Sequence, residues 1–255
     1  MANDHVSYNV NVEDGNYVIH YTFKDHLDKV CSITWKLNKK QTDRDIREFG
    51  IPKSMFEPFP DLPEYKARHK EIIGKGLFME KGNTIIVDKN AMINKYASYT
   101  KILANWMIKY LKNNYTDTRL NRIKLAMCFV QDIPYAVPDD FDPNWYYGGV
   151  IATPNIFTCG YGDCDTKAIL FVGILCHLIS PDDIRFAGEP GHVYTIIKND
   201  DTKLVENGTT TYFELEDGKY VVAETAGPGR LNFGEAHSSK YNSARIEKIN
   251  FLGPR

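Results

Sequence analysis

The sequence predicts an α+β fold, with an antiparallel β unit at its start and, farther along, a buried helix packed on a small antiparallel sheet. Three observations indicate this. Apolar residues alternate with polar ones through the first 37 positions, which is the period of half-buried strands. Apolar residues then recur at three- and four-residue steps from residue 92 to 130, as in amphipathic helices. Residues 168–178 are apolar on nearly every side, and strand-like segments follow them.

The N-terminal β unit is expected to contain three strands. The turn signal EDGN separates the first two alternating runs, so the runs should pair antiparallel. Four prolines between residues 52 and 63 then break regular structure. We therefore predict a β-rich unit at 1–60 and a second domain at 61–255. The alternating apolar residues are Val6, Tyr8, Val10 and Val12, then Tyr17, Ile19, Tyr21 and Phe23, then Cys31, Ile33, Trp35 and Leu37.

Two amphipathic helices are expected early in the second domain, after a short strand at 84–88. Apolar spacing places the first between Met92 and Tyr110 and the second between Leu120 and Val130. Asp117 is a candidate N-cap for the second helix.

The buried helix follows a loop at 131–150 that is rich in proline, aspartate and aromatic residues. Pro181 is expected to end this helix. The segments HVYTII at 192–197 and KYVVAET at 219–225 then predict strands of the small sheet.

Composition and charge exclude several classes of protein. The chain of 255 residues has a formal net charge of −2, so it lacks the basic field that draws proteins to nucleic acid. No run of about 18 apolar residues is present, so no membrane insertion is expected. The five cysteines are too few and scattered for a disulfide scaffold, and a signal-peptide pattern is absent. These features favour the cytoplasm, although a secreted or virion-associated protein without its leader would look the same, and they leave the oligomeric state open.

Cys164 lies in the stretch GYGDCDTKAIL, where glycines give way to the buried helix. If this helix begins near Asp163, unpaired amides and the helix dipole favour an anion at the sulfur. Gly160 and Gly162 leave the sulfur uncrowded. Asp163 and Asp165 oppose a thiolate by like charge, or they cap the helix. An ordinary buried thiol is the alternative interpretation.

His192 and Glu224 are candidate partners for a nucleophilic thiol. His192 follows a glycine turn and opens a strand that is expected to pack against the buried helix. Glu224 ends the neighbouring strand, where it could fix the tautomer of the imidazole. A structural histidine and a solvated glutamate are the alternatives.

Four segments together resemble the transglutaminase-like superfamily, over roughly residues 90 to 240. The resemblance implies a papain-like core with a nucleophilic cysteine at the start of a central helix, and a histidine and an acid on the strands that follow. The segments are FVQDIPY (129–135), GYGDCDTKAILFVGIL (160–175), GHVYTII (191–197) and YVVAETAGPGRLNFGE (220–235).

The resemblance implies a role for each candidate residue. Cys164 would be the nucleophile, His192 the general base and acid, and Glu224 the residue that orients His192, although the superfamily has aspartate more often at this third position. Gln131 is a candidate oxyanion donor beside the backbone amide of Cys164. No cofactor or metal is implied.

Asp165 shifts the expected reaction towards hydrolysis. Crosslinking animal transglutaminases usually have an aromatic residue directly after the nucleophile, whereas this chain resembles microbial relatives with GDCD. We therefore expect a cysteine hydrolase, a peptidase or amidase, that acts on a protein or peptide substrate. A protein-crosslinking acyl transferase is one alternative, and a non-catalytic assembly or binding module that retains the fold is another.

Two other features have competing interpretations. Cys159, Cys164, Cys176, His177 and His192 are close in sequence, but their spacing matches no zinc pattern. The aromatic residues at 145–147 either form a lip over the cleft or pack against the domain.

Overall fold

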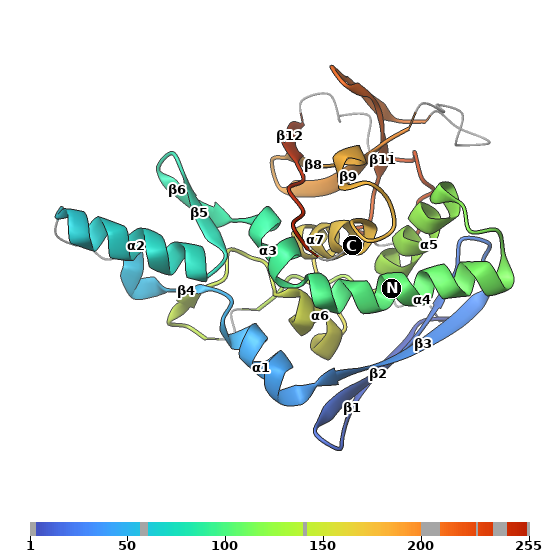
Figure 1. Ribbon diagram of the computed structural model, residues 1–255, viewed down its shortest axis with the longest axis horizontal. Helices are drawn as coiled ribbons and strands as arrows, with labels where there is room; N and C mark the ends of the chain where they lie inside the picture. Colours follow the sequence, from blue (N-terminus) through green and yellow to red (C-terminus); the bar gives the residue numbers. More distant parts are fainter. Residues whose placement is uncertain are drawn as a thin grey trace.

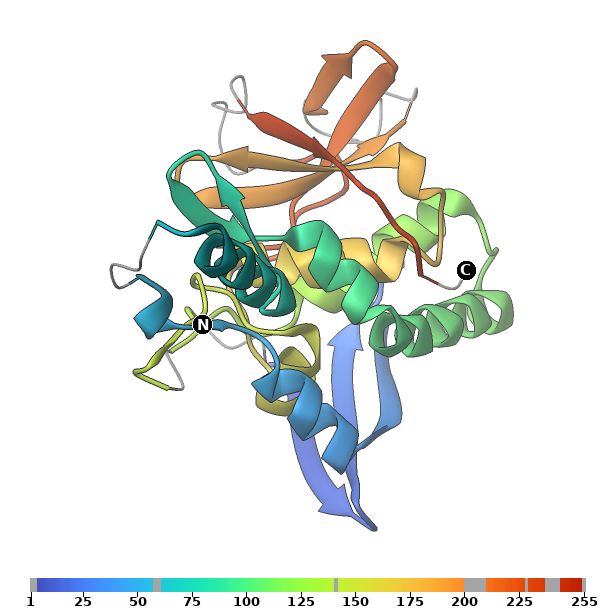
Figure 2. The ribbon, with the colours of Figure 1, turned by 60° about the vertical axis from the view of Figure 1, so that its left-hand side comes forward.

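The computed structural model describes residues 4–56, 61–139, 142–199, 210–227, 229–236 and 244–253. The fold is mixed α+β with antiparallel sheets, as the sequence predicts. The helices form a central layer, with a three-stranded sheet at one end and a five-stranded sheet at the other (Figure 2). None of the described helices has both the length and the apolar character needed to cross a membrane.

The three-stranded sheet confirms the predicted N-terminal β unit. Asp14 and Gly15 have positive φ angles and form the tight turn between the first two strands. One face of the sheet is buried and the other exposed, so burial alternates residue by residue along the third strand. The sheet has the order β1-β2-β3 and consists of β1 (Ser7–Glu13), β2 (Asn16–Lys24) and β3 (Val30–Asn38).

The segment after this sheet contains helices that the sequence analysis missed. α2 begins at Pro63, a residue that was expected to break regular structure. Proline is favoured at the first helical position because its missing N–H has no intrahelical acceptor there. The elements are α1 (Lys39–Arg47), β4 (Ile51–Pro52), a 3₁₀ turn (Lys53–Phe56), α2 (Pro63–Lys75), β5 (Phe78–Lys81) and β6 (Thr84–Val87).

The β unit and the rest of the chain share one hydrophobic core. Tyr21 packs edge-on against Phe129, and Trp35 against Phe157, with ring centroids 5.0 and 5.6 Å apart. The boundary predicted near residue 60 falls at 57–60, which lie outside the described residues.

Three helices precede the buried helix in the chain and pack against it (Figure 1). The single helix expected at 92–110 is two helices, because the chain leaves helical geometry at Tyr96. Thr118, rather than the expected Asp117, caps the next helix, while Asp117 binds Arg122. The helices are α3 (Lys89–Lys95), α4 (Ala97–Asn114) and α5 (Arg119–Gln131).

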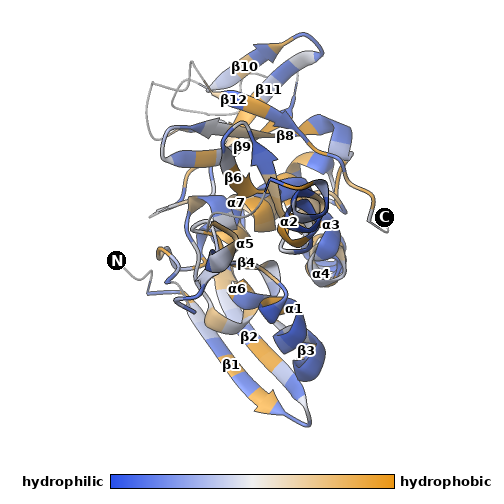
Figure 3. Cartoon of the chain, turned by 90° about the vertical axis from the view of Figure 1, so that its left-hand side faces the viewer, coloured by the Kyte–Doolittle hydropathy of each residue, from blue (hydrophilic) through white to orange (hydrophobic). Residues whose placement is uncertain are grey.

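The buried helix is α7 (Cys164–Leu175), which follows the short α6 (Thr153–Cys159). It packs against α3, α4, α5, α6 and a strand of the five-stranded sheet. Every residue of α7 except Asp165 is buried, and Figure 3 shows this helix between the two sheets. α7 ends before Pro181, which instead opens a 3₁₀ turn (Pro181–Asp183).

The five-stranded sheet is antiparallel throughout, with the order β10-β11-β9-β8-β12. The residue pattern predicts β9 and β11, whereas the other three strands have no pattern that reveals them. One face packs on α7, and a second small apolar cluster covers the other face. The strands are β8 (Ile184–Glu189), β9 (His192–Lys198), β10 (Tyr212–Leu215), β11 (Gly218–Ala223) and β12 (Arg245–Lys248). A two-residue strand, β7 (Trp145–Tyr146), pairs with β4.

Candidate active site

Cys164 is the first residue of α7. The side chain of Asp163 caps the helix by accepting a hydrogen bond from the amide of Thr166 at 3.0 Å. Gly160 ends α6 in the left-handed conformation, and a Cβ at Gly162 would lie 2.9 Å from the Thr166 side chain. The two glycines therefore permit the sharp passage from α6 to α7 that leaves the thiol where the helix dipole favours an anion.

His192 and Glu224 lie side by side at the ends of neighbouring strands. His192 opens β9 after Gly191, and Glu224 directly follows β11, which pairs with β9. The His192 Nε2 and Glu224 Oε2 atoms are 2.6 Å apart. Hydrogen bonding to the thiol of Cys164, and then to Glu224, raises the pKa of His192 to about 10. The structure thus brings together the three residues that the sequence singled out.

The carboxylate of Glu224 is fixed on both sides. Its side chain is buried, and its second oxygen, Oε1, accepts a hydrogen bond from the amide of Ala226 at 2.8 Å. Because both oxygens are engaged, the carboxylate holds the imidazole of His192 in one orientation.

Gln131 is not positioned as the oxyanion donor that the sequence analysis expected. Its amide nitrogen donates to the carbonyl oxygens of Glu224, at 2.8 Å, and Leu231, at 3.0 Å. These two bonds use both hydrogens of the amide, so none is left for a substrate oxygen. Gln131 instead ties the end of α5 to the backbone that carries Glu224.

Lys167 is a buried cation that the sequence analysis did not identify. Its ammonium donates to three backbone carbonyls, those of Gln131, Ile133 and Ala226, at distances of 2.9 to 3.1 Å. Burial lowers the pKa of Lys167 to about 7, although Asp132 and Glu224 act in the opposite direction. This side chain joins α7 to the end of α5 and to the segment that follows Glu224.

Arg230 connects the same region to the three-stranded sheet. It forms an ion pair with Asp132, whose side chain is fully buried, and donates to the backbone carbonyls of Lys24 and Asp25. Asp132 also accepts from the amide of Lys24 and from His5. Burial alone would raise the pKa of Asp132, but these hydrogen bonds, chiefly that of Arg230, hold it below its ordinary value.

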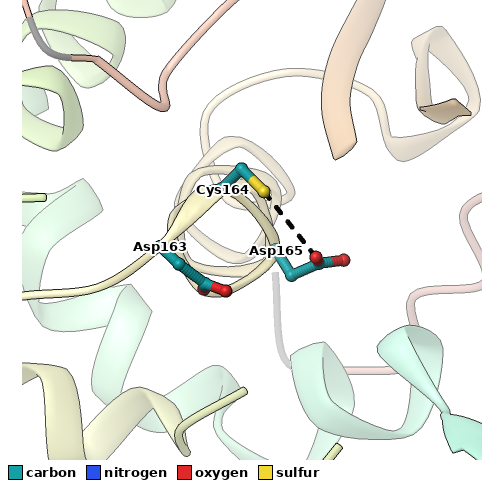
Figure 4. Close-up of side chains that lie close together, drawn as sticks. All are labelled: Asp163, Cys164 and Asp165. Atoms are coloured by element: carbon teal, nitrogen blue, oxygen red, sulfur yellow. Dashed lines mark hydrogen bonds between the residues drawn. The ribbon is translucent and has the colours of Figure 1, made fainter. Parts of the chain in front are cut away.

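The cysteines and histidines that are close in sequence do not come together as a set of metal ligands among the described residues. His177 binds Thr100 and the carbonyl of Ala97 instead. Among the described residues, the one group of three ligand-type side chains within 4.8 Å is Asp163, Cys164 and Asp165. Figure 4 shows that the sulfur points towards Asp165 and away from Asp163, whose carboxylate caps the helix.

All five cysteines are free, consistent with the prediction that they form no disulfide scaffold. Burial raises the pKa of Cys31 to about 11 and that of Cys128 to about 12, and it also raises the pKa of Cys159. These thiols are therefore poor nucleophiles at neutral pH.

No model of a known protein family, no curated protein and no solved structure matches this chain.

Proposed function

We propose that this protein is a cysteine hydrolase, a peptidase or amidase, with a transglutaminase-like, papain-like core. The observation that carries the proposal is His192, which lies 2.6 Å from the buried carboxylate of Glu224 and whose pKa is raised by the thiol of Cys164 and by Glu224. A thiol at a helix N-terminus, a ring that holds a proton and a buried carboxylate are the three parts that nucleophilic thiol catalysis requires.

The acylation step follows from this arrangement. His192 holds the proton of the thiol, and the Cys164 thiolate attacks the carbonyl carbon of the substrate. The backbone amide of Cys164, at the start of α7, donates to the oxygen that gains charge. His192 then gives its proton to the leaving amine as the carbon–nitrogen bond breaks, which leaves a thioester on Cys164.

The deacylation step reverses the proton movement. His192 takes a proton from a water molecule, whose oxygen attacks the thioester carbon. The carbon–sulfur bond then breaks, which releases the carboxylic acid product and leaves the Cys164 thiolate beside the protonated His192. Glu224 remains ionised and orients the ring throughout. An amine in place of water would give acyl transfer, so the two reactions share the first half.

Asp165 is the observation that favours water over an amine from a protein. It follows the nucleophile directly, and its carboxylate lies 3.7 Å from the sulfur. The site therefore has a carboxyl group at the position where the crosslinking transglutaminases that the chain resembles have an aromatic side chain.

A paired assay on one protein substrate tests the proposal. Denatured casein is incubated with the protein, and new amino termini are measured in parallel with incorporation of a fluorescent primary amine. We expect new amino termini and little incorporation. Cys164→Ala should abolish both signals, whereas Cys176→Ala, which removes a buried thiol at the other end of α7, should keep both. Incorporation that exceeds cleavage would favour the acyl transferase, and activity retained in Cys164→Ala would refute the mechanism.

A further inference from the structure

A cavity of about 260 Å³ lies beside the start of α7. Residues 85–87 of β6, Tyr146, Val150 and Ile169 supply its apolar lining, and Lys89 and Asp165 add charged groups. This volume is below the 300–1,000 Å³ range of pockets for drug-sized ligands, so it suits a single side chain. Tyr146, one of the three aromatic residues whose role was open, lines the cavity and packs on Phe56 and Phe78.

Asp165 joins this cavity to the nucleophile. It lines the cavity, and it is the one residue of α7 that is not buried. Its Oδ2 atom lies 3.7 Å from the Sγ atom of Cys164 (Figure 4). A substrate whose carbonyl carbon reaches the sulfur therefore has a neighbouring side chain within reach of the cavity.

The two charged residues that line the cavity differ in whether they have an ion-pair partner. The lining residue of opposite charge, Lys89, pairs with Glu247 at 2.9 Å and sits over the ring of Phe186. Asp165 is in no ion pair among the described residues. Burial raises the pKa of Asp165, and Asp163 adds like charge, while Lys89, the Cys164 thiol and His192 act against these effects. A cation placed in the cavity would compensate for the desolvation of an ionised Asp165.

We propose that this cavity is the subsite for a substrate side chain next to the scissile bond, and that Asp165 selects a side chain with an aliphatic stem and a terminal ammonium group, as in lysine. The inference rests on the proposed function, because it assigns the substrate class of the same site. The stem packs on β6, Val150 and Ile169, and the ammonium pairs with the carboxylate of Asp165.

A second cavity of about 390 Å³ continues the same surface. It shares Ile86 and Lys89 with the first cavity and reaches Glu189 and Val193, which flank the histidine turn. The two cavities thus approach the site from the Cys164 side and from the His192 side, as a surface that binds an extended substrate requires.

Affinity labelling tests the selectivity directly. The probes are the chloromethyl ketones of N-acylated lysine and norleucine, whose side chains differ in the terminal ammonium. The Cys164 thiolate forms a carbon–sulfur bond, chloride leaves, and intact mass reports the rate. The wild type should react at least about tenfold faster with the lysine probe, since a charge-assisted hydrogen bond supports a ratio of that size. Each rate is divided by that of iodoacetamide at Cys164, which corrects for changes in the reactivity of the thiol.

Two matched variants complete the experiment. Asp165→Asn should reduce the lysine-to-norleucine ratio to within about twofold of unity. Asp163→Asn removes the same charge from the other neighbour of Cys164, keeps an N-cap residue and should retain most of the preference.

The outcomes separate the two proposals. Equal rates for both probes in the wild type, or an undiminished lysine preference in Asp165→Asn, would overturn the proposed subsite. Rapid labelling of Cys164 by iodoacetamide in the same experiment would still support the proposed hydrolase. Equal loss of the lysine preference in both variants would show that the overall negative charge near Cys164 causes the preference, and it would overturn the assignment to this cavity. A Cys164 that reacts with none of the three reagents would overturn the hydrolase and the subsite together.

Discussion

The two larger sheets differ in how many of their faces are buried. The three-stranded sheet buries one face and leaves the other in solvent, as the alternation along β3 shows. The five-stranded sheet is buried on both faces at its centre, where Ile197 and Val221 face α7 and Ile196 and Val222 belong to the second cluster. His192 and Glu224 project from the ends of these doubly buried strands. We infer that the second sheet is the rigid support of the site and that the first contributes packing.

The largest difference is expected between the effects on turnover of replacing one histidine on each sheet. His192→Ala and Cys164→Ala should each lower turnover by at least about 10³-fold, because the members of such a triad act as a unit. Glu224→Gln should cost less than either. His20→Ala removes an exposed imidazole that contacts Thr34 on the three-stranded sheet and should leave turnover unchanged. Initial rates of casein cleavage measure all four, with circular dichroism to check the fold.

The connection between the two regions should be the next most sensitive. Arg230→Met leaves the buried Asp132 without its cation, so the free energy of unfolding should fall by about 3–5 kcal/mol. The change also frees the pKa of Asp132 to rise, so the folded variant takes up a proton as pH falls, which neutralises the unpaired carboxylate, and the loss should become smaller towards pH 4. Arg44→Ala, which breaks a pair exposed on both sides, should have nearly no effect in the same urea titrations. Equal effects of the two changes would show that Arg230 does not join the regions.

Outward-facing positions of the two sheets should differ in stability. Ile196→Ala deletes a fully buried side chain from the second cluster and should lower the free energy of unfolding by about 2–5 kcal/mol. Thr34→Ala, on the solvent face of β3, should change it by less than about 0.5 kcal/mol. Denaturant unfolding monitored by fluorescence measures both. Similar values would contradict the difference between the sheets.

The smallest expected effect is a change in the pH dependence of stability at Lys167. Its folded-state pKa of about 7 lies below its ordinary 10.5, so the unfolded chain binds more protons between these values. The stability of the wild type relative to Lys167→Met should therefore rise by about 2 kcal/mol from pH 7 to pH 9.

His192 provides the opposite comparison. Its folded-state pKa is raised from 6.5 to about 10, so its contribution is complete below pH 6.5 and is lost as pH rises through 10. The stability of the wild type relative to His192→Gln should therefore fall over the range in which the Lys167 comparison rises. Parallel slopes for the two variants would contradict one of the two assignments.

The sequence predicts the regions in which solvent imposes a pattern. β1, β2 and β3 were found because one face is exposed, and α7 because it is apolar all round. β8 is not predicted because burial on both faces removes the alternation of apolar and polar residues. α1 is not predicted because its buried residues, Thr42 and Asp45, are polar.

The candidate site was predictable to the extent that it depends on single residues in chain order. The proximity of Cys164, His192 and Glu224 followed from the helix start and two neighbouring strand ends. The contacts of Gln131 and Lys167 are to backbone carbonyls that come together only in the fold. No residue pattern reports such contacts, which is why one residue was misassigned and the other missed.

The central claim is that Cys164 and His192 form a working thiolate–imidazolium pair, and the pH dependence of iodoacetamide labelling tests it most directly. Mass spectrometry resolves the five cysteines, and His192→Ala is labelled in parallel. The proposal predicts that Cys164 reacts fastest, well below about pH 8, and loses this advantage in His192→Ala. Labelling of Cys164 that matches the other four thiols, or that does not change without His192, would contradict it.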